Sequence, residues 1–309
     1  MTRNTSLLTA MALVMAMFGL VDISAEKEII FPEISALAIG FWIMEKPPWR
    51  GSPLAVWASP SLAALTGVAL FRYVPLPAFV LIACAFVLVV VQLKLMRSEV
   101  FPSVSAAILA ILTETTSWLY PLSVSMLMAV IVLGKLAGEH FVPDRVWNAA
   151  AATDTDPENG LGYWSKIFCG VLAITALALG SGHLFMIAPP LIVAFIELSR
   201  PHHPLRRAPM KTVALLFAAA ITGVLWFYVI VTALDGPLWL FGGLALGTVF
   251  VLYRAFGTSF PPVAAIALLP VLVPACALWS YPLHVLAGAM LFVSMGVFIF
   301  DSSLVRARK

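Results

Sequence analysis

Charged side chains are scarce in this chain. Its 309 residues include 18 Lys or Arg and 15 Asp or Glu, together 11%, whereas an ordinary soluble domain carries about 25% charged residues. Hydrophobic residues make up 62% of the sequence, and the mean hydropathy is +1.02. The scarcity of charge excludes a typical water-soluble fold. The formal net charge of +3 gives no basis for nucleic-acid binding, because the basic residues fall in short loops.

Reactive and catalytic motifs are also missing. The three cysteines, Cys84, Cys169 and Cys276, form no CxxC pair, and we expect them to be small apolar packing residues. His183 and His284 have no second ligand three or four positions away, so no metal is expected. The sequence has no Asp-rich pair for prenyl transfer, no HExxH, no GxSxG and no P-loop. We therefore predict that the protein is not an enzyme and has no cofactor.

Long apolar runs repeat from one end of the chain to the other. Because a lipid-embedded backbone must satisfy its own hydrogen bonds, these runs predict membrane helices. A β-barrel would require strict alternation of polar and apolar positions, which the runs do not show. The predicted segments are 7–22, 30–44, 53–71, 75–94, 101–117, 120–137, 167–182, 184–198, 211–232, 236–253, 260–277 and 281–300.

The distribution of basic residues predicts the orientation. With a cytoplasmic N-terminus and twelve segments, 16 of the 18 Lys and Arg residues fall on the cytoplasmic side, and only Lys27 and Arg72 lie outside. This positive-inside pattern predicts a multi-pass protein of the cell inner membrane with both termini in the cytoplasm. A polar stretch, 141–165, reads as a cytoplasmic linker between membrane modules at 1–140 and 166–309.

One short motif occurs four times. The copies are Phe31-Pro32-Glu33, Phe101-Pro102-Ser103, Ala188-Pro189-Pro190 and Phe260-Pro261-Pro262. A second proline follows each copy, at Pro53, Pro121, Pro209 and Pro282, with spacings of 21, 19, 20 and 21. Such periodicity indicates internal repeats. The predicted fold is an all-α polytopic membrane protein with two parallel six-segment halves, each built of two inverted three-segment repeats, as in many transporters.

The proline-led segments are short for membrane spans. At 1.5 Å per residue they reach only about 16–21 Å, against a hydrocarbon core of about 30 Å. Their N-termini are therefore predicted to lie inside the membrane, where free N–H groups would form an anion site. The expected substrate pathway comprises Pro32, Glu33, Ser35, Pro102, Ser103, Ser105, Pro189, Pro190, Pro261 and Pro262. The competing interpretation is that the prolines only start helices and the serines bond to the preceding turn.

Six acidic residues lie near apolar segments, most of them at segment ends: Asp22, Glu33, Glu45, Glu114, Glu197 and Asp301. Glu33 is in the first turn of a short helix, and two interpretations stay open: proton coupling or gating, and an ordinary helix-start charge at the outer surface. Glu197 precedes Arg200 by three positions, which predicts an ion pair along one helix face.

These motifs resemble the HPP family of integral membrane proteins. The resemblance covers about 20–137 and about 175–300, so the chain looks like two HPP-type modules in tandem. Phe260-Pro261-Pro262 is most similar to the His-Pro-Pro helix of the family, although Phe101 and Phe260 replace the family histidine, and Ser103 replaces the second proline. Plant members of the family are linked to nitrite transport, so the resemblance implies a pathway for a small anion.

Two functions remain open from the sequence. The first is a transporter or channel for a small solute, with an inorganic anion such as nitrite expected. The second is a non-transport membrane subunit, a scaffold or a lipid-handling protein. The bilayer is the expected partner, and small-residue faces such as Gly242 to Gly247 are compatible with a homo-oligomer.

Overall fold

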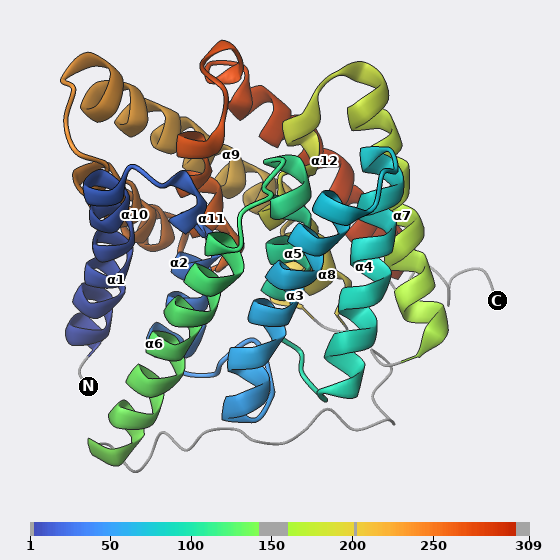
Figure 1. Cartoon of the computed structure of the whole chain (residues 1–309), viewed down its shortest axis with the longest axis horizontal. Coiled ribbons are helices and arrows are strands. Elements are labelled where there is room, and N and C mark those ends of the chain that lie inside the picture. The colour runs from blue at the N-terminus through green and yellow to red at the C-terminus, as the bar shows by residue number, and fades with distance from the viewer. Residues whose placement is uncertain (1–2, 142–159, 201–202, 301–309) are drawn as a thin grey trace.

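The computed structural model describes residues 3–141, 160–200 and 203–300, and over these ranges it is all-helical. Figure 1 shows long helices surrounding shorter ones. Eight helices are long and apolar enough to cross a membrane. They are α1 (Arg3–Ser24), α3 (Pro53–Tyr73), α4 (Ala78–Leu95), α6 (Leu119–Phe141), α7 (Leu161–Ser181), α9 (Pro209–Phe227), α10 (Leu238–Phe256) and α12 (Tyr281–Phe300). The central part of the predicted linker and both chain ends lie outside the described residues.

Four further helices are short, and each begins at a copy of the proline motif. They are α2 (Glu33–Ala38), α5 (Pro102–Leu112), α8 (Pro189–Ser199) and α11 (Pro262–Leu268). The π turn η2 (Ile39–Ile43) continues α2, and the 3-10 turn η7 (Leu269–Leu272) continues α11. The prediction that these helices are too short to span is confirmed by their lengths of 6, 11, 11 and 7 residues. Eight candidate spans, rather than twelve, are therefore present in the described chain.

Local sequence explains where the helices begin and end. Proline occupies the first turn of α3, α5, α8, α9 and α11, a position at which its missing N–H has no helical partner to lose. Ser52 caps α3 by accepting a hydrogen bond from the Ala55 N–H at 3.1 Å. Gly182 and Gly257 end α7 and α10 with φ angles of +73° and +58°, which favour glycine. Short helical turns lie in several of the connections: η1 (Lys27–Ile29), η4 (Leu184–Ile187), η5 (Pro204–Arg207) and η8 (Ala275–Ala277). The π-helical η6 (Tyr228–Ala233) continues α9.

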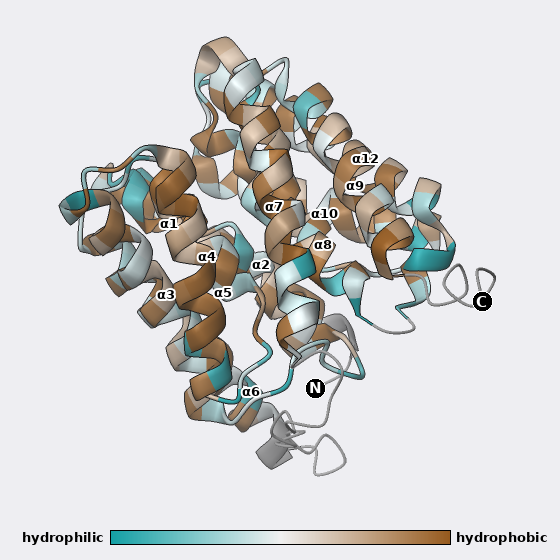
Figure 2. Cartoon of the chain, turned by 90° about the vertical axis from the view of Figure 1, so that its right-hand side faces the viewer, coloured by the Kyte–Doolittle hydropathy of each residue, from teal (hydrophilic) through white to brown (hydrophobic). Residues whose placement is uncertain are grey.

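The two halves of the chain interlock. Helix α1 packs against α10, and α4 packs against α7, so each half supplies a long helix to the other. Apolar side chains run along the helices, while polar ones gather at helix ends and loops (Figure 2). Cys169 and Cys276 are exposed, so the prediction that they are packing residues is wrong for these two. Many exposed side chains are also large and apolar, so hydrophobicity alone does not distinguish surface residues from core residues in this protein.

Candidate functional site

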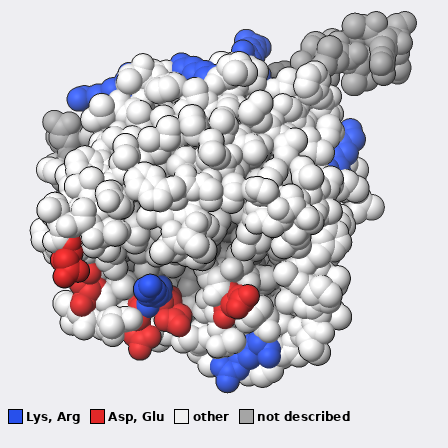
Figure 3. All heavy atoms as spheres, turned by 90° about the horizontal axis from the view of Figure 1, so that it is seen from above, with Lys and Arg blue, Asp and Glu red and all other residues white. Residues whose placement is uncertain are grey.

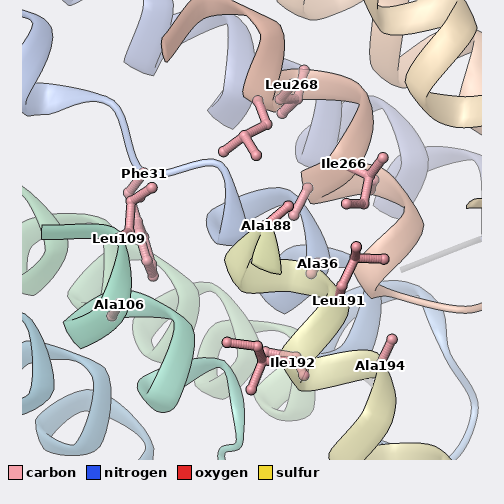
Figure 4. Packing of buried hydrophobic residues seen from close by; sticks show 14 of the residues in the cluster. Phe31, Ala36, Ala106, Leu109, Ala188, Leu191, Ile192, Ala194, Ile266 and Leu268 are labelled. Carbon is pink, nitrogen blue, oxygen red and sulfur yellow. The ribbon is translucent and has the colours of Figure 1, made fainter. Parts of the chain in front are cut away.

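The four short helices form the centre of the molecule. Contacts run from α2 to α5, from α5 to α8, from α8 to α11 and from α11 back to α2, which closes a ring. Small and branched side chains allow this close approach, and Figure 4 shows Ala36, Ala188 and Ile266 among those that meet there. Every residue of α2, α8 and α11 is buried, as are all residues of α5 except Leu112. The ring is therefore a packed core without an open channel.

The first turns of these helices do not offer free N–H groups. The N–H of Ile34 donates to Phe31, that of Ser103 to Val100, that of Leu191 to Ala188 and that of Val263 to Phe260, at 2.8–3.1 Å. The prediction of an anion site built from unpaired helix N-termini is therefore wrong. The chain enters each of these helices through a tight turn. The hydrogen bonds of that turn engage the N–H groups that an isolated α-helix would leave without partners.

A buried polar contact lies where α2 meets α5, and we call Glu33 and Ser105 the Glu33 cluster. The Glu33 carboxyl is 1% exposed and accepts a hydrogen bond from the Ser105 hydroxyl through Oε1. Glu33 Oε2 and Ser103 Oγ are buried with no hydrogen-bond partner. The structure thus brings together two of the predicted site residues, Glu33 and Ser105. It also excludes the interpretation of Glu33 as a surface charge.

The other predicted site residues have different surroundings. The Ser35 hydroxyl donates a hydrogen bond to the carbonyl of Pro32 at 2.7 Å. This serine therefore bonds to the preceding turn, as the competing interpretation predicted. Pro32, Pro102, Pro189, Pro190, Pro261 and Pro262 are all buried at the starts of the short helices. Helix α11 has no hydroxyl side chain that could correspond to Ser103 or Ser105 of α5. The polar cluster is therefore confined to the α2–α5 pair.

Two tyrosines flank the Glu33 cluster, and sequence reasoning did not select them. Tyr120 of α6 and Tyr281 of α12 lie within electrostatic reach of the Glu33 carboxyl. Their hydroxyls donate to the carbonyls of Ala106 in α5 and Ile266 in α11, at 2.9 and 2.8 Å. Each tyrosine adjoins the second proline of its motif, at Tyr120-Pro121 and Tyr281-Pro282, and that repeated pair was the signal that marked them.

A cavity of about 830 Å³ opens on one face of the molecule above the ring, and we call it the vestibule. The C-terminal end of α5 and the turn η7 line it, together with η4, η6 and Pro189. Most of its lining is apolar, with Lys27, Glu28 and Glu114 among the few charged groups. Figure 3 shows this face, with acidic and basic side chains gathered along one part of it. Tyr120 belongs both to the vestibule lining and to the electrostatic surroundings of Glu33, so this one side chain lies between the vestibule and the cluster.

Comparison with protein families assigns the second half of the chain. The model of the HPP transmembrane region matches residues 154–307, a stretch that includes α7 to α12. This chain belongs to the HPP family. It is thus an integral multi-pass membrane protein, as its eight apolar helices also indicate. Searches of curated proteins and of solved structures gave no match.

The face of this HPP protein opposite the vestibule is closed by polar contacts between the two halves. The Arg200 guanidinium forms an ion pair with Glu99, donates to the carbonyl of Pro48 and lies 5.0 Å from the centre of the Phe101 ring. The Trp49 indole N–H donates to Glu197 Oε1 at 3.1 Å. We call these residues the Arg200 lock. Glu197 lies within electrostatic reach of Arg200, as the sequence predicts, and each of the two also has a partner in the first half of the chain.

Basic residues also stabilise the end of α8 beside this lock. Arg206 donates to the carbonyls of Leu198 and Arg200, which the end of the helix leaves without partners, and to that of Phe300. Burial, together with Arg200 and Arg206, lowers the pKa of His203 from its usual 6.5 to about 4. His203 therefore remains neutral at physiological pH, and its ring lies 5.8 Å from that of Phe260.

The isolated histidines of the sequence are neighbours in space. The rings of His183 and His284 lie 4.8 Å apart in an edge-to-face arrangement. Among the described residues, no group of three or more His, Cys, Asp or Glu side chains has the arrangement that a metal ion needs. The two rings form an aromatic contact between α12 and the turn that follows α7.

Proposed function

We propose that this HPP family protein transports a small solute, an inorganic anion such as nitrite, between the vestibule and the opposite face. The observation that carries the proposal is the difference between the two faces. One face has a vestibule of about 830 Å³ whose lining includes Tyr120, a neighbour of the Glu33 cluster, and the other face is closed by the Arg200 lock. A pathway open to one side and closed to the other is what an alternating-access transporter requires.

We further propose that the chain is built of four related units in two parallel halves, each half containing an inverted pair. Equivalent contacts support this. Gly67 of α3 approaches the backbone of Ala107 in α5, and Gly223 of α9 approaches that of Ala267 in α11. Tyr120 and Tyr281 bond to α5 and α11 in the same way. In transporters, movement of one such unit against another exchanges access between the two faces of the membrane.

The proposed solute class rests on the family resemblance and on the donors available. Because the first-turn N–H groups are engaged, the hydroxyl of Ser103 is the free donor that the ring offers to an anion. Passage requires the short helices to separate, since the ring is closed in this conformation. The inner membrane is the proposed location, with the Arg200 lock toward the cytoplasm.

The test is a flux assay on the purified protein in liposomes, with nitrite, nitrate, formate and chloride as probes. Protein-dependent flux of at least one anion is expected. Ala275→Trp places a large side chain on the exposed vestibule wall, so it should reduce that flux several-fold. Cys276→Trp is the matched control, because Cys276 is exposed but does not line the vestibule. Absence of flux for every anion, or equal effects of the two variants, would contradict the proposal.

The apolar lining of the vestibule favours one alternative, the handling of a lipid-like molecule without transport. Leu109, Phe185, Phe227, Leu272 and Trp279 are among the residues that line it. Cavities of about 300–1,000 Å³ with mostly apolar walls suit organic ligands. Co-purification of a lipid that Ala275→Trp displaces, in a protein that moves no anion, would favour this alternative.

A further inference from the structure

Three acidic side chains are buried in the described part of the chain: Glu33, Glu99 and Glu197. Of these three, Glu33 is the one that has no arginine near its carboxyl group. Glu99 pairs with Arg200 and Arg50. Glu197 accepts the indole N–H of Trp49 and lies near Arg200. Glu33 has the Ser105 hydroxyl and its own backbone N–H on its carboxyl, and Oε2 has no partner.

The elements around Glu33 supply no compensating charge. Helices α5 and α11 and the turn η2 contain no ionisable side chain. Helix α6 contributes Tyr120 at its start, and its Lys135 lies fifteen residues further on, about 22 Å along the helix axis. Helix α12 contributes Tyr281 at its start, and its His284 contacts His183. On α1, Asp22 lies at the end of the helix, where it accepts the N–H groups of Leu238 and Trp239. Lys27 and Glu28, which precede α2, line the vestibule.

An ionised carboxyl in such surroundings is costly, because neither water nor a cation balances its charge. The neutral acid is favoured, with its proton on the oxygen that has no partner and with Ser105 holding the other oxygen. An anion that passes the α2–α5 contact would meet strong repulsion from an ionised Glu33 and none from the neutral acid. The charge of this one side chain therefore decides whether an anion can enter the ring.

We propose that Glu33 is a proton-binding site that couples proton movement to anion transport. This inference rests on the proposed function. The proton reaches Glu33 from the vestibule beside Tyr120, and the anion enters the ring while the carboxyl is neutral. When the Arg200 lock opens, both leave on the opposite face, where access to water allows the carboxyl to ionise. One proton and one monovalent anion thus cross together, and no net charge is moved.

The decisive comparison is between Glu33→Gln and wild type in liposomes under a pH gradient. One proton per anion allows accumulation of up to about tenfold for each pH unit of gradient. The wild type should accumulate nitrite on the alkaline side, and protein-free liposomes record leakage of the neutral acid. Glu33→Gln, a permanent mimic of the neutral acid, should lose this accumulation, and any anion movement that it retains should no longer respond to the pH gradient.

Glu45→Gln is the matched control, since Glu45 is exposed in the loop that follows α2 and should keep pH-driven accumulation. Accumulation by Glu33→Gln equal to that of wild type would overturn the inference. So would accumulation that requires Na⁺ rather than a pH gradient.

A second measurement is independent of transport. Infrared difference spectra of wild type minus Glu33→Gln should contain a neutral carboxylic acid band at neutral pH. Absence of that band would overturn the inference even where flux is observed. If no anion moves at all, the proposed function fails, and the band still decides whether Glu33 binds a proton.

Discussion

Two glycines allow the long helices to touch the short ones. A Cβ placed on Gly67 would lie 2.3 Å from the carbonyl oxygen of Ala107, and one on Gly223 would lie 2.3 Å from that of Ala267. The obstructing atoms belong to helix backbones, which cannot turn aside as a flexible side chain does. Both positions therefore depend on the absence of a side chain, and both hold a helix of the central ring against a candidate span.

Gly67→Ala and Gly223→Ala should each destabilise the protein by about 1–3 kcal/mol, because the added methyl group overpacks a backbone contact. The measurement is the midpoint of thermal unfolding in detergent. Gly180→Ala in α7 is the control, since a Cβ there meets nothing within 4 Å, and alanine is the better helix former. Equal midpoints for all three variants would show that the close approach does not contribute to stability.

At the scale of secondary structure, the Arg200 lock joins three elements that are distant in sequence. Pro48 and Trp49 lie in the loop between η2 and α3, Glu99 lies between α4 and α5, and Arg200 follows α8. The lock therefore holds the ends of α2 and α8 to the start of α5. Opening of this face requires these contacts to break together.

Arg200→Ala should favour opening of this face. A Cys at position 98, introduced by Ser98→Cys with the three natural cysteines replaced, reports access, because Ser98 is only 6% exposed beside the lock. Maleimide labelling should accelerate about tenfold, which corresponds to a shift of about 1.4 kcal/mol in the equilibrium. Arg207→Ala is the control, since Arg207 is exposed and adjoins no lock residue. Identical labelling of both variants would contradict the gating role.

For the molecule as a whole, charge distinguishes the two faces. Lys27 lies at the vestibule and Arg72 lies in the last turn of α3 on the same side, whereas Arg50, Arg200 and Arg206 lie around the lock. Because positive residues favour the cytoplasmic side, the vestibule is expected to face outward.

Reporter fusions test this orientation. A fluorescent protein after Lys309 should fluoresce, and alkaline phosphatase after Leu76, in the connection between α3 and α4, should be active. Fluorescent protein folds in the cytoplasm, and phosphatase is active only outside it. The reverse pattern would overturn the predicted orientation and the assignment of the vestibule as the outer opening.

Local chemistry explains how much the sequence alone determined. Composition established a membrane protein, because few charges and long apolar runs leave lipid as the solvent. Prolines marked the helix starts, since their effect acts within one turn. For the same reason, the sequence predicted that the four proline-led helices are short. It also identified Glu33, Ser103 and Ser105 as candidate site residues.

Tertiary structure alone decided the rest. The contact between Glu33 and Ser105 joins residues 72 positions apart, and that between Arg200 and Glu99 joins residues 101 apart. No local pattern specifies such pairs, because they depend on which helices pack together. The same packing closed the ring and left Glu33 Oε2 without a partner. The sequence predicted free N–H groups at the starts of the short helices, but the chain enters each of these helices through a tight turn that engages them. This turn is a feature of the backbone geometry, which the proline content does not reveal.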